Sequence, residues 1–286
     1  MLRYKLPLVL AGFAIFGVAC SPAPTVDSPA PAAEAPSDEA APDVTQGAPD
    51  ATVDAGGVRQ IFDHAAAAIA APAEFDAFVF YLHGRIIEDA GRRPTHPDFG
   101  VYEYDEVLEA LAAPGVAVIS EARGPQTDVT SYASTIVSQI VELFAAGVEP
   151  AAISVVGFSK GGNIALQVSH RLGHDDVGFI ILAACGTWLD GLEIDGSPLR
   201  LHGRMLSIHE ESDRIGSCRP WVEPSLPNLF FHEIEINIGG SHGAFYTPRA
   251  EWLDQTLIWT GAPSVRQQMS VPERIEVTAD EADRPS

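Results

Sequence analysis

Between about residue 78 and residue 260, the chain alternates short apolar segments with longer segments of helical periodicity. The segments 78–83 and 153–158 contain few polar side chains, which is typical of strands that are buried on both faces. In 130–146, apolar residues recur every three or four positions, which predicts a helix that stops at Gly147. Strands of this kind need helices on both sides, so we predict an α/β fold with a mostly parallel central sheet covered on both faces. Further strands are expected at 116–120, 179–184, 205–209 and 233–238, and further helices at 104–113, 163–172 and 249–260.

The sequence Gly157-Phe158-Ser159-Lys160-Gly161-Gly162 lies where the predicted strand 153–158 meets the predicted helix 163–172. A G-x-S-x-G pattern between a strand and a helix is typical of a nucleophile elbow. Such a turn holds its serine in a strained conformation, and the flanking glycines let the strand and the helix approach each other. The serine hydroxyl then lies at the start of the helix, where the helix dipole favours developing negative charge. We therefore interpret Ser159 as a nucleophile, and a glycine-rich turn without chemistry is the alternative.

Three more polar motifs follow predicted strands of their own. They are His83-Gly84-Arg85 after the first strand, Glu210-Glu211-Ser212-Asp213-Arg214-Ile215 after 205–209, and Gly239-Gly240-Ser241-His242-Gly243 after 233–238. Together with Ser159, these motifs resemble the α/β-hydrolase superfamily across nearly all of 58–260. Two features depart from the full fold of that superfamily. The chain has no room for two antiparallel strands before residue 78, and the roughly twenty residues between 183 and 204 are too few for a large insertion. The resemblance therefore implies a reduced α/β-hydrolase fold without a substantial cap domain.

The resemblance implies a catalytic triad in the chain order nucleophile, acid, base. Ser159 would attack the substrate, His242 would act as the general base, and Asp213 would orient the histidine ring. Glu210 and Glu211 are the alternatives for the acid, because they lie on the same loop. The glycines on either side of the histidine would give its ring room to reach the serine.

The resemblance also implies an oxyanion hole built from main-chain N–H groups. One donor would be the N–H of Arg85, with Ile86 as the alternative, and the other would be the N–H of Lys160. In this interpretation His83 shapes the loop and is not a catalyst, and a plain strand-ending turn is the alternative. The two acidic residues that follow are expected to be solvated or paired with nearby arginines: Glu88 and Asp89 with Arg85, Arg92 or Arg93.

The first twenty residues resemble the signal of a bacterial lipoprotein. Two basic residues precede an unbroken apolar run at 6–19, which is too short to span a bilayer but suits a signal peptide. Cys20 would become the lipid-modified first residue, although Gly17 stands where such signals usually carry leucine. We expect 1–19 to be a signal peptide, and the protein to be exported and lipid-anchored to a bacterial membrane, on the periplasmic or outer-membrane side. An ordinary signal peptide cut nearby is the alternative.

Composition indicates polar segments at both ends of the chain. Residues 20–57 are rich in proline, alanine and acidic residues and contain no aromatic or basic residue. Such a segment buries too little apolar surface to offset its ordering entropy, so we expect a disordered acidic linker. A similar composition at 268–286 predicts a flexible tail, which leaves 58–267 as the α/β-hydrolase domain.

The two remaining cysteines, Cys185 and Cys218, each follow a predicted strand at the sheet edge where Ser159 lies. Cysteines of an exported protein can pair, so we expect a disulfide between them, with two unpaired thiols as the alternative. Their spacing does not suit a zinc site, and neither a metal nor an organic cofactor is expected.

The formal net charge of −22 argues against a nucleic-acid partner, because so acidic a surface repels phosphate backbones. The sequence instead predicts a serine hydrolase that performs esterase-like acyl transfer on a small ester-type substrate. Two alternatives remain open: a serine peptidase, which shares the same triad, and a non-catalytic, hydrolase-like binding lipoprotein. Sequence alone does not distinguish esters from amides, because one fold serves many substrates.

Overall fold

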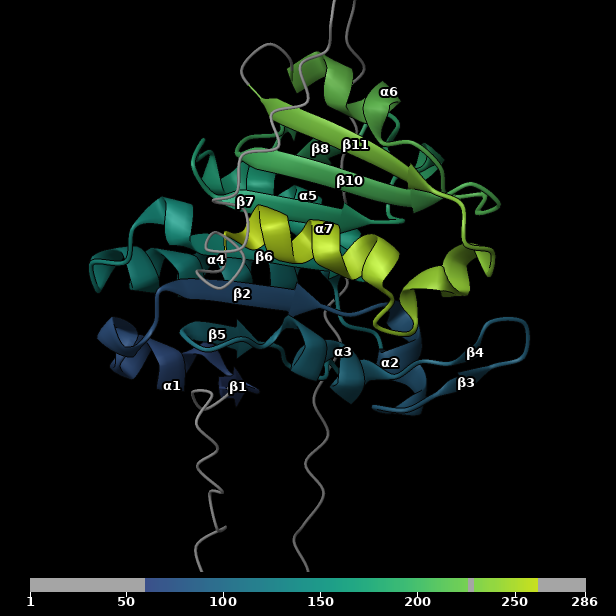
Figure 1. Cartoon of the computed structure of the whole chain (residues 1–286). Coiled ribbons are helices and arrows are strands. Elements are labelled where there is room, and N and C mark those ends of the chain that lie inside the picture. The colour runs from purple at the N-terminus through teal and green to yellow at the C-terminus, as the bar shows by residue number, and fades with distance from the viewer. Residues whose placement is uncertain (1–59, 226–228, 262–286) are drawn as a thin grey trace, which may run out of the picture. The chain divides into compact units, whose positions relative to one another are not determined.

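A seven-stranded sheet forms the centre of the computed structural model, which describes residues 60–225 and 229–261 (Figure 1). The strands lie in the order β1-β5-β2-β6-β7-β10-β11, and neighbouring strands are parallel. Their bounds are β1 (Gln60–Phe62), β2 (Ala77–Leu82), β5 (Val116–Ile119), β6 (Ile153–Phe158), β7 (Gly178–Leu182), β10 (Arg204–Glu210) and β11 (Phe230–Ile236). The predicted signal peptide, Cys20, the linker to residue 57 and the tail at 268–286 lie outside the described residues.

Helices and two small hairpins occupy the connections between these strands. The described helices are α1 (Ala65–Ala70), α2 (Arg85–Ala90), α3 (Tyr104–Leu111), α4 (Val129–Ala145), α5 (Lys160–Leu172), α6 (Arg219–Val222) and α7 (Ala250–Thr260). The hairpins are β3 (Thr95–His96) with β4 (Gly100–Val101), and β8 (Glu193–Ile194) with β9 (Ser197–Pro198). Short 3₁₀ helices are η1 (Pro72–Glu74), η2 (Pro150–Ala152), η3 (Thr187–Leu189), η4 (Glu223–Ser225) and η5 (Ser241–Phe245).

Both faces of the sheet are apolar, and each is covered by helices. In β2, Phe78, Phe80 and Leu82 join the core beneath α1, α4 and α5, whereas Val79 and Tyr81 join the core beneath α3 and α7. All five side chains are buried. Figure 1 shows α7 crossing one face of the sheet, with α4 and α5 on the other. The predicted fold class, a parallel sheet with helices on both faces, is therefore confirmed.

The sheet is reduced, as expected, but the first part of the chain contributes one strand that the sequence did not predict. Residues Gln60–Phe62 form β1, which pairs with β5 in the parallel direction. Three residues are too few to show a period of two or an apolar run, so no pattern marked them. The loop expected after His83 also differs, because Arg85–Ala90 forms the helix α2. This helix is less than two turns long, which is too short for its periodicity to be recognised.

The strand order places the crevice of the sheet between β2 and β6. From β2 the chain runs outward to β5 on one side, and then returns to β6 on the other side of β2. In parallel α/β sheets, ligands bind beyond the carboxyl ends of the strands at this kind of reversal. Gly84 follows β2 and Ser159 follows β6, so both candidate motifs lie at the edge of the sheet where a ligand is expected.

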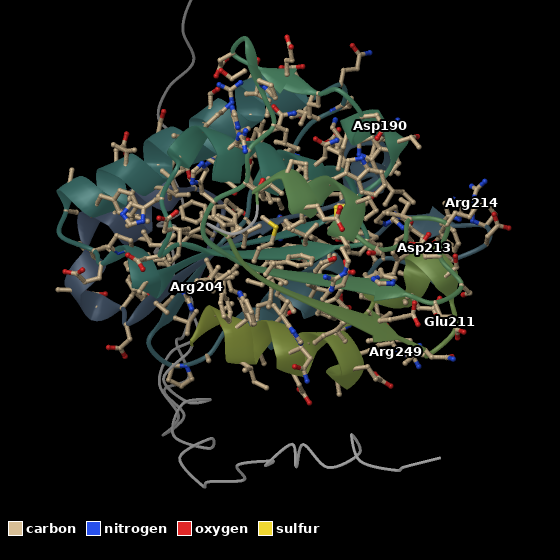
Figure 2. All side chains as sticks on the ribbon, turned by 90° about the horizontal axis from the view of Figure 1, so that it is seen from above. Asp190, Arg204, Glu211, Asp213, Arg214 and Arg249 are labelled. Atoms are coloured by element: carbon tan, nitrogen blue, oxygen red, sulfur yellow. A yellow bond between two sulfur atoms is a disulfide. The ribbon has the colours of Figure 1, made fainter. Side chains whose placement is uncertain are left out.

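The segment between β7 and β10 forms a short hairpin and no larger insertion, which agrees with the absence of a substantial cap domain from the predicted fold. A disulfide joins Cys185, just after β7, to Cys218, at the start of α6 (Figure 2). The two Cα atoms are 5.0 Å apart, within the range that a disulfide spans without backbone movement. Because β7 and β10 are neighbours, this bond links the segments that follow two adjacent strands.

We predict that replacing both cysteines, by Cys185→Ala and Cys218→Ala, lowers the free energy of unfolding by roughly 3–4 kcal/mol. The bond closes a loop of 33 positions, and the loss follows from the entropy that this closure removes from the unfolded chain. Thermal unfolding of the oxidised chain and of the double variant measures the difference. A count of two free thiols in the unfolded, unreduced chain carrying Cys20→Ala would contradict the bond.

Candidate active site

Ser159 occupies a backbone conformation that side chains rarely adopt. Its φ is 54° and its ψ is −118°, at the junction where β6 ends and α5 begins. The main-chain N–H of Ser159 donates a hydrogen bond of 2.9 Å to the carbonyl oxygen of Leu182, the last residue of β7. A non-glycine residue in such a conformation is strained, and the surrounding structure must hold it there. This is the geometry expected of a nucleophile elbow.

Three glycines around Ser159 permit this turn. A Cβ atom on Gly157 would overlap the backbone of Gly161, and one on Gly161 would overlap the carbonyl oxygen of Leu82. A Cβ atom on Gly162 would overlap the side chain of Ala184. The close approach of β6, α5 and β2 therefore requires glycine at positions 157 and 161, as the G-x-S-x-G pattern indicates, and the segment after β7 requires it at 162 as well.

The structure brings Ser159, His242 and Asp213 together, although they come from three separate loops. His242 Nε2 lies 2.9 Å from Ser159 Oγ, and His242 Nδ1 lies 2.7 Å from Asp213 Oδ2. An ionised carboxylate only accepts hydrogen bonds, so Nδ1 carries the ring proton. In the neutral imidazole, Nε2 is then the acceptor for the serine hydroxyl. The arrangement has the geometry of a Ser-His-Asp triad.

Asp213 is held in place by its own turn. Its Oδ1 accepts a hydrogen bond of 3.0 Å from the main-chain N–H of Ile215, and its side chain is 4% exposed. With one oxygen fixed in this way, the other oxygen is directed at His242. Figure 2 shows Asp213 and Glu211 at the same end of the molecule, on the turn that follows β10.

The two alternative acids have other partners. Glu210 accepts hydrogen bonds from the main-chain N–H groups of Ser212 (2.8 Å) and Gly239 (3.1 Å). Burial raises the pKa of Glu210, but a hydrogen bond from the Ser212 hydroxyl, together with those from the main-chain N–H groups of Ser212, Gly239 and Ile238, outweighs burial and lowers it overall. The Glu211 carboxylate accepts from the Asn237 amide at the surface. Neither carboxylate forms a hydrogen bond with His242. Glu210 instead connects the turn that carries Asp213 to the loop that carries His242.

His83 fixes the orientation of the peptide bond that carries the Arg85 N–H. The ring is buried, and its Nε2 accepts a hydrogen bond of 2.8 Å from the main-chain N–H of Arg123. The other nitrogen, Nδ1, therefore carries the proton and donates to the Gly84 carbonyl oxygen at 2.8 Å. Burial, and then the charge of Arg123, lowers the pKa of His83 to about 3, so the ring stays neutral. A trans peptide points its C=O and N–H in opposite directions, so this bond turns the Arg85 N–H away from His83.

The expected oxyanion donors, the N–H groups of Arg85 and Lys160, both stand at the first position of a helix. An N–H at that position has no acceptor within its own helix. Within the described residues, neither of these two N–H groups donates a hydrogen bond to an acceptor outside its helix. Both residues line the larger of two cavities beside Ser159, whereas Ile86 lines only the smaller one. The pair Arg85 and Lys160 therefore suits the binding of an oxyanion better than a pair that includes Ile86.

The expectation for Glu88 was wrong. This residue is 4% exposed, and it forms no ion pair with Arg85, Arg92 or Arg93 among the described residues. Instead, its two carboxylate oxygens pair with Arg123 and Lys160. No sequence pattern indicated these pairs, because the three partners lie on different elements and a buried ion pair has no periodicity.

The two cavities open on either side of Ser159. The first, of about 360 Å³, is lined by Arg85, Val129, Ser159, Lys160, Asn163, Trp188 and Ile215. The second, of about 260 Å³, is lined by Gly84, Arg85, Ile86, Asp89, His96, Phe99, Phe158, Ser159, His242 and Tyr246. The sequence did not predict two of the lining residues, Trp188 after β7 and Phe99 on the β3–β4 hairpin. Trp188 lies in the three-residue 3₁₀ helix η3 and Phe99 in a hairpin turn, and segments this short show no periodic pattern.

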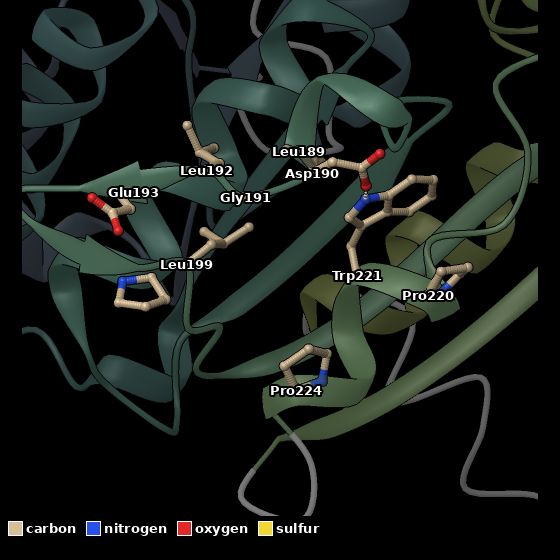
Figure 3. Close-up of a pocket in the computed structure, with 10 residues that line it drawn as sticks. Leu189, Asp190, Gly191, Leu192, Glu193, Leu199, Pro220, Trp221 and Pro224 are labelled. Atoms are coloured by element: carbon tan, nitrogen blue, oxygen red, sulfur yellow. Dashed lines mark hydrogen bonds between the residues drawn. The ribbon is translucent and has the colours of Figure 1, made fainter.

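A third cavity, of about 290 Å³, lies apart from the triad (Figure 3). It is bounded by the β8–β9 hairpin on one side and by α6 on the other, and Trp221 Nε1 donates to Asp190 at 2.8 Å. None of its lining residues belongs to the candidate triad or to the candidate oxyanion donors. In the part of the chain that the structure describes, no three His, Cys, Asp or Glu side chains gather as a metal site would need.

No protein-family model matches this sequence, and no curated protein matches it. Several solved structures are similar in fold. SOBER1 of Arabidopsis thaliana is 13% identical, with a TM-score of 0.39 over 65% of this chain and 97% of that one. RedJ is 12% identical, with a TM-score of 0.44 over 66% and 95% of the two chains. Esterase PE8 is 16% identical, with a TM-score of 0.40 over 71% and 96%. At identities this low, the chemistry of this chain rests on its own residues.

We predict that Asp213→Asn lowers kcat for an activated ester by roughly 10³- to 10⁴-fold, because an amide facing Nδ1 favours the wrong imidazole tautomer. Glu211→Gln is the matched control, since Glu211 lies on the same turn and contacts Asn237 instead. Its rate should stay within about twofold of the unmodified chain. Steady-state hydrolysis of a 4-nitrophenyl ester measures both variants, and the reverse order of effects would assign the acid to Glu211.

Proposed function

We propose that this chain is a serine hydrolase that performs esterase-like acyl transfer through Ser159, His242 and Asp213. One observation carries the proposal: His242 lies within hydrogen-bond distance of both Ser159 Oγ and Asp213, while Ser159 sits in the strained elbow. A nucleophile, its base and an orienting acid in one chain of hydrogen bonds are the parts that acyl transfer needs.

The geometry supports the following sequence of steps. His242 Nε2 takes the proton of the Ser159 hydroxyl as Oγ attacks the substrate carbonyl carbon, and the carbonyl oxygen becomes an oxyanion. The N–H groups of Arg85 and Lys160 stabilise that oxyanion. The imidazolium, stabilised by Asp213, then returns its proton to the leaving alcohol as the C–O bond breaks. Water, deprotonated by His242, attacks the acyl-enzyme in the same way, and Ser159 regains its proton as the acid is released.

A small ester-type substrate fits the two cavities beside Ser159. Their volumes, about 360 and 260 Å³, lie at or below the lower end of the range for small-molecule sites. One cavity would take the acyl group and the other the alcohol, because both contain Ser159 and each extends to a different side. Val129, Trp188 and Ile215 contribute the apolar side chains of the first cavity.

A serine peptidase would use the same three residues, so it remains the second enzymatic candidate. A peptide would have to extend beyond these small cavities, and for that reason we favour the ester. A non-catalytic binding protein is the third candidate, but it would have no need to maintain the strain at Ser159. Rates on matched ester and amide substrates distinguish the first two candidates.

We predict that the purified chain is labelled by a fluorophosphonate probe at Ser159, and that Ser159→Ala abolishes both labelling and hydrolysis. The expected loss in kcat is about 10⁶-fold, because triad members act as a unit. Mass spectrometry of the labelled peptide identifies the residue, and a panel of short-chain 4-nitrophenyl esters measures the rate. An unlabelled chain that hydrolyses no ester in the panel would leave only the binding candidate.

We also propose that the protein lies outside the cytoplasm, exported and held to a bacterial membrane by a lipid on Cys20. The apolar run at 6–19 supports export, and so does the disulfide between Cys185 and Cys218, because such bonds persist in oxidising compartments. In the regions that the structure describes, no helix has both the length and the apolar character needed to cross a membrane.

We predict that Cys20→Ala moves the protein from the membrane fraction to the soluble fraction without changing its rate of ester hydrolysis. The substitution removes the thiol that would carry the lipid, and Cys20 belongs to no part of the described catalytic site. Cell fractionation with immunoblotting measures the distribution. If the variant stays with the membrane, the tether is something other than a lipid on this cysteine.

A further inference from the structure

The buried ion pairs of Glu88 connect the two loops that carry the oxyanion donors. Glu88 Oε2 accepts a hydrogen bond of 2.5 Å from Lys160 Nζ, and Glu88 Oε1 accepts one of 3.0 Å from Arg123 Nε. The exposed fractions of the side chains are 1% for Glu88, 0% for Arg123 and 12% for Lys160. Burying three charges is costly, so an arrangement of this kind calls for an explanation beyond stability.

The positions of these residues supply that explanation. Lys160 directly follows Ser159, and its main-chain N–H is one expected oxyanion donor. Glu88 lies on α2, which begins at Arg85, the residue that carries the other donor. The ion pair between Lys160 and Glu88 therefore spans the gap between the two donors, from the side chain of one donor residue to the helix of the other.

Two further contacts fix the positions of the Lys160 and Arg123 side chains. Lys160 Nζ also donates to the carbonyl oxygen of Thr127 at 2.6 Å, which gives the ammonium a second fixed partner. The Arg123 side chain also donates to the carbonyl oxygen of His83, the residue whose ring orients the Gly84–Arg85 peptide. Arg123 thus contacts the oxyanion loop at two places, through Glu88 and through His83.

We propose that Lys160 is a positioning residue whose side chain, through Glu88, sets the distance between the two main-chain oxyanion donors. The inference rests on the proposed acyl-transfer function. Donors that are correctly placed before reaction stabilise the transition state without reorganising, and a displacement of about 1 Å can cost on the order of 100-fold in rate. Two of the three N–H donors of the lysine ammonium are directed at Glu88 and Thr127, so in this proposal the side chain acts through Glu88.

The test compares Lys160→Met with a matched variant at the other end of the same helix. Lys160→Met keeps an unbranched side chain, one atom shorter and without the charge, and leaves Glu88 paired with Arg123. Arg171→Met is the control, because Arg171 also lies on α5, pairs with Asp195 and has a side chain 14% exposed. We expect Lys160→Met to lower kcat for a 4-nitrophenyl ester about 10- to 100-fold with KM within about threefold. Arg171→Met should lower the melting temperature without changing kcat.

A second readout separates positioning from a purely structural role. A trifluoromethyl ketone forms a tetrahedral adduct with the serine, so its inhibition constant should rise in Lys160→Met by about the same factor as kcat/KM falls. Lys160→Arg retains a cation that can reach Glu88, and it should recover most of the lost rate. If Lys160→Met is insoluble, Lys160→Gln takes its place, with a smaller loss expected because its amide can still donate to Glu88.

Three results would overturn the proposal. The first is a Lys160→Met variant with a lower melting temperature but unchanged kcat and inhibitor affinity, since the ion pair would then serve stability alone. The second is a rise in KM alone, which would make Lys160 a substrate contact. The third is an unmodified chain that neither reacts with a fluorophosphonate nor hydrolyses an ester. That last result is distinguishable from the others, because it removes the proposed function itself.

Discussion

At the carboxyl end of β2, the carbonyl oxygen of Leu82 lies against the backbone of Gly161, and no side chain fits between them. This contact brings the first turn of α5 against the end of β2. It therefore brings the loop after β2 close to Ser159, so that Arg85 and Lys160 border one cavity. The strain at Ser159 and the placement of the candidate oxyanion donors both depend on this contact between two backbones.

Hydrogen bonds and ion pairs then fix the loops around Ser159 relative to one another. Glu210 accepts hydrogen bonds from the turn that carries Asp213 and from the loop that carries His242, so it connects the segments of the candidate acid and the candidate base. On the other side of the serine, Glu88 links the two donor loops in a similar way. In each case a buried carboxylate that contacts neither Ser159 nor His242 joins two loops of the candidate site. Such groups are costly to bury unless all their hydrogen bonds are made, which restricts them to one geometry.

The fold and the meeting of Ser159, Asp213 and His242 could be predicted from sequence, because both leave local patterns. The apolar segments predicted most of the strands, and the glycines around Ser159 identified the elbow. The resemblance implies Asp213 as the acid, with Glu210 and Glu211 as alternatives, and in the described residues only Asp213 forms a hydrogen bond with His242. The ion pairs of Glu88 could not be predicted, because they join α2, the segment after β5 and α5. The cavity walls at Trp188 and Phe99 were missed for the same reason, since tertiary packing alone places them.

The all-parallel sheet also governs when the active site can form during folding. The seven strands of this sheet include no hairpin, so no pair of neighbouring strands can form by pairing outward from a tight turn. Each parallel pair forms only after its crossover connection has closed. Ser159 and His242 are separated by 83 positions, and the histidine follows β11, the last of the described strands. A partly folded chain that lacks β11 would present the elbow without His242, its candidate base. If the chain has the proposed hydrolase activity, recovery of that activity during refolding would report the completion of the sheet, and it would lag behind any spectroscopic signal that follows helix formation alone.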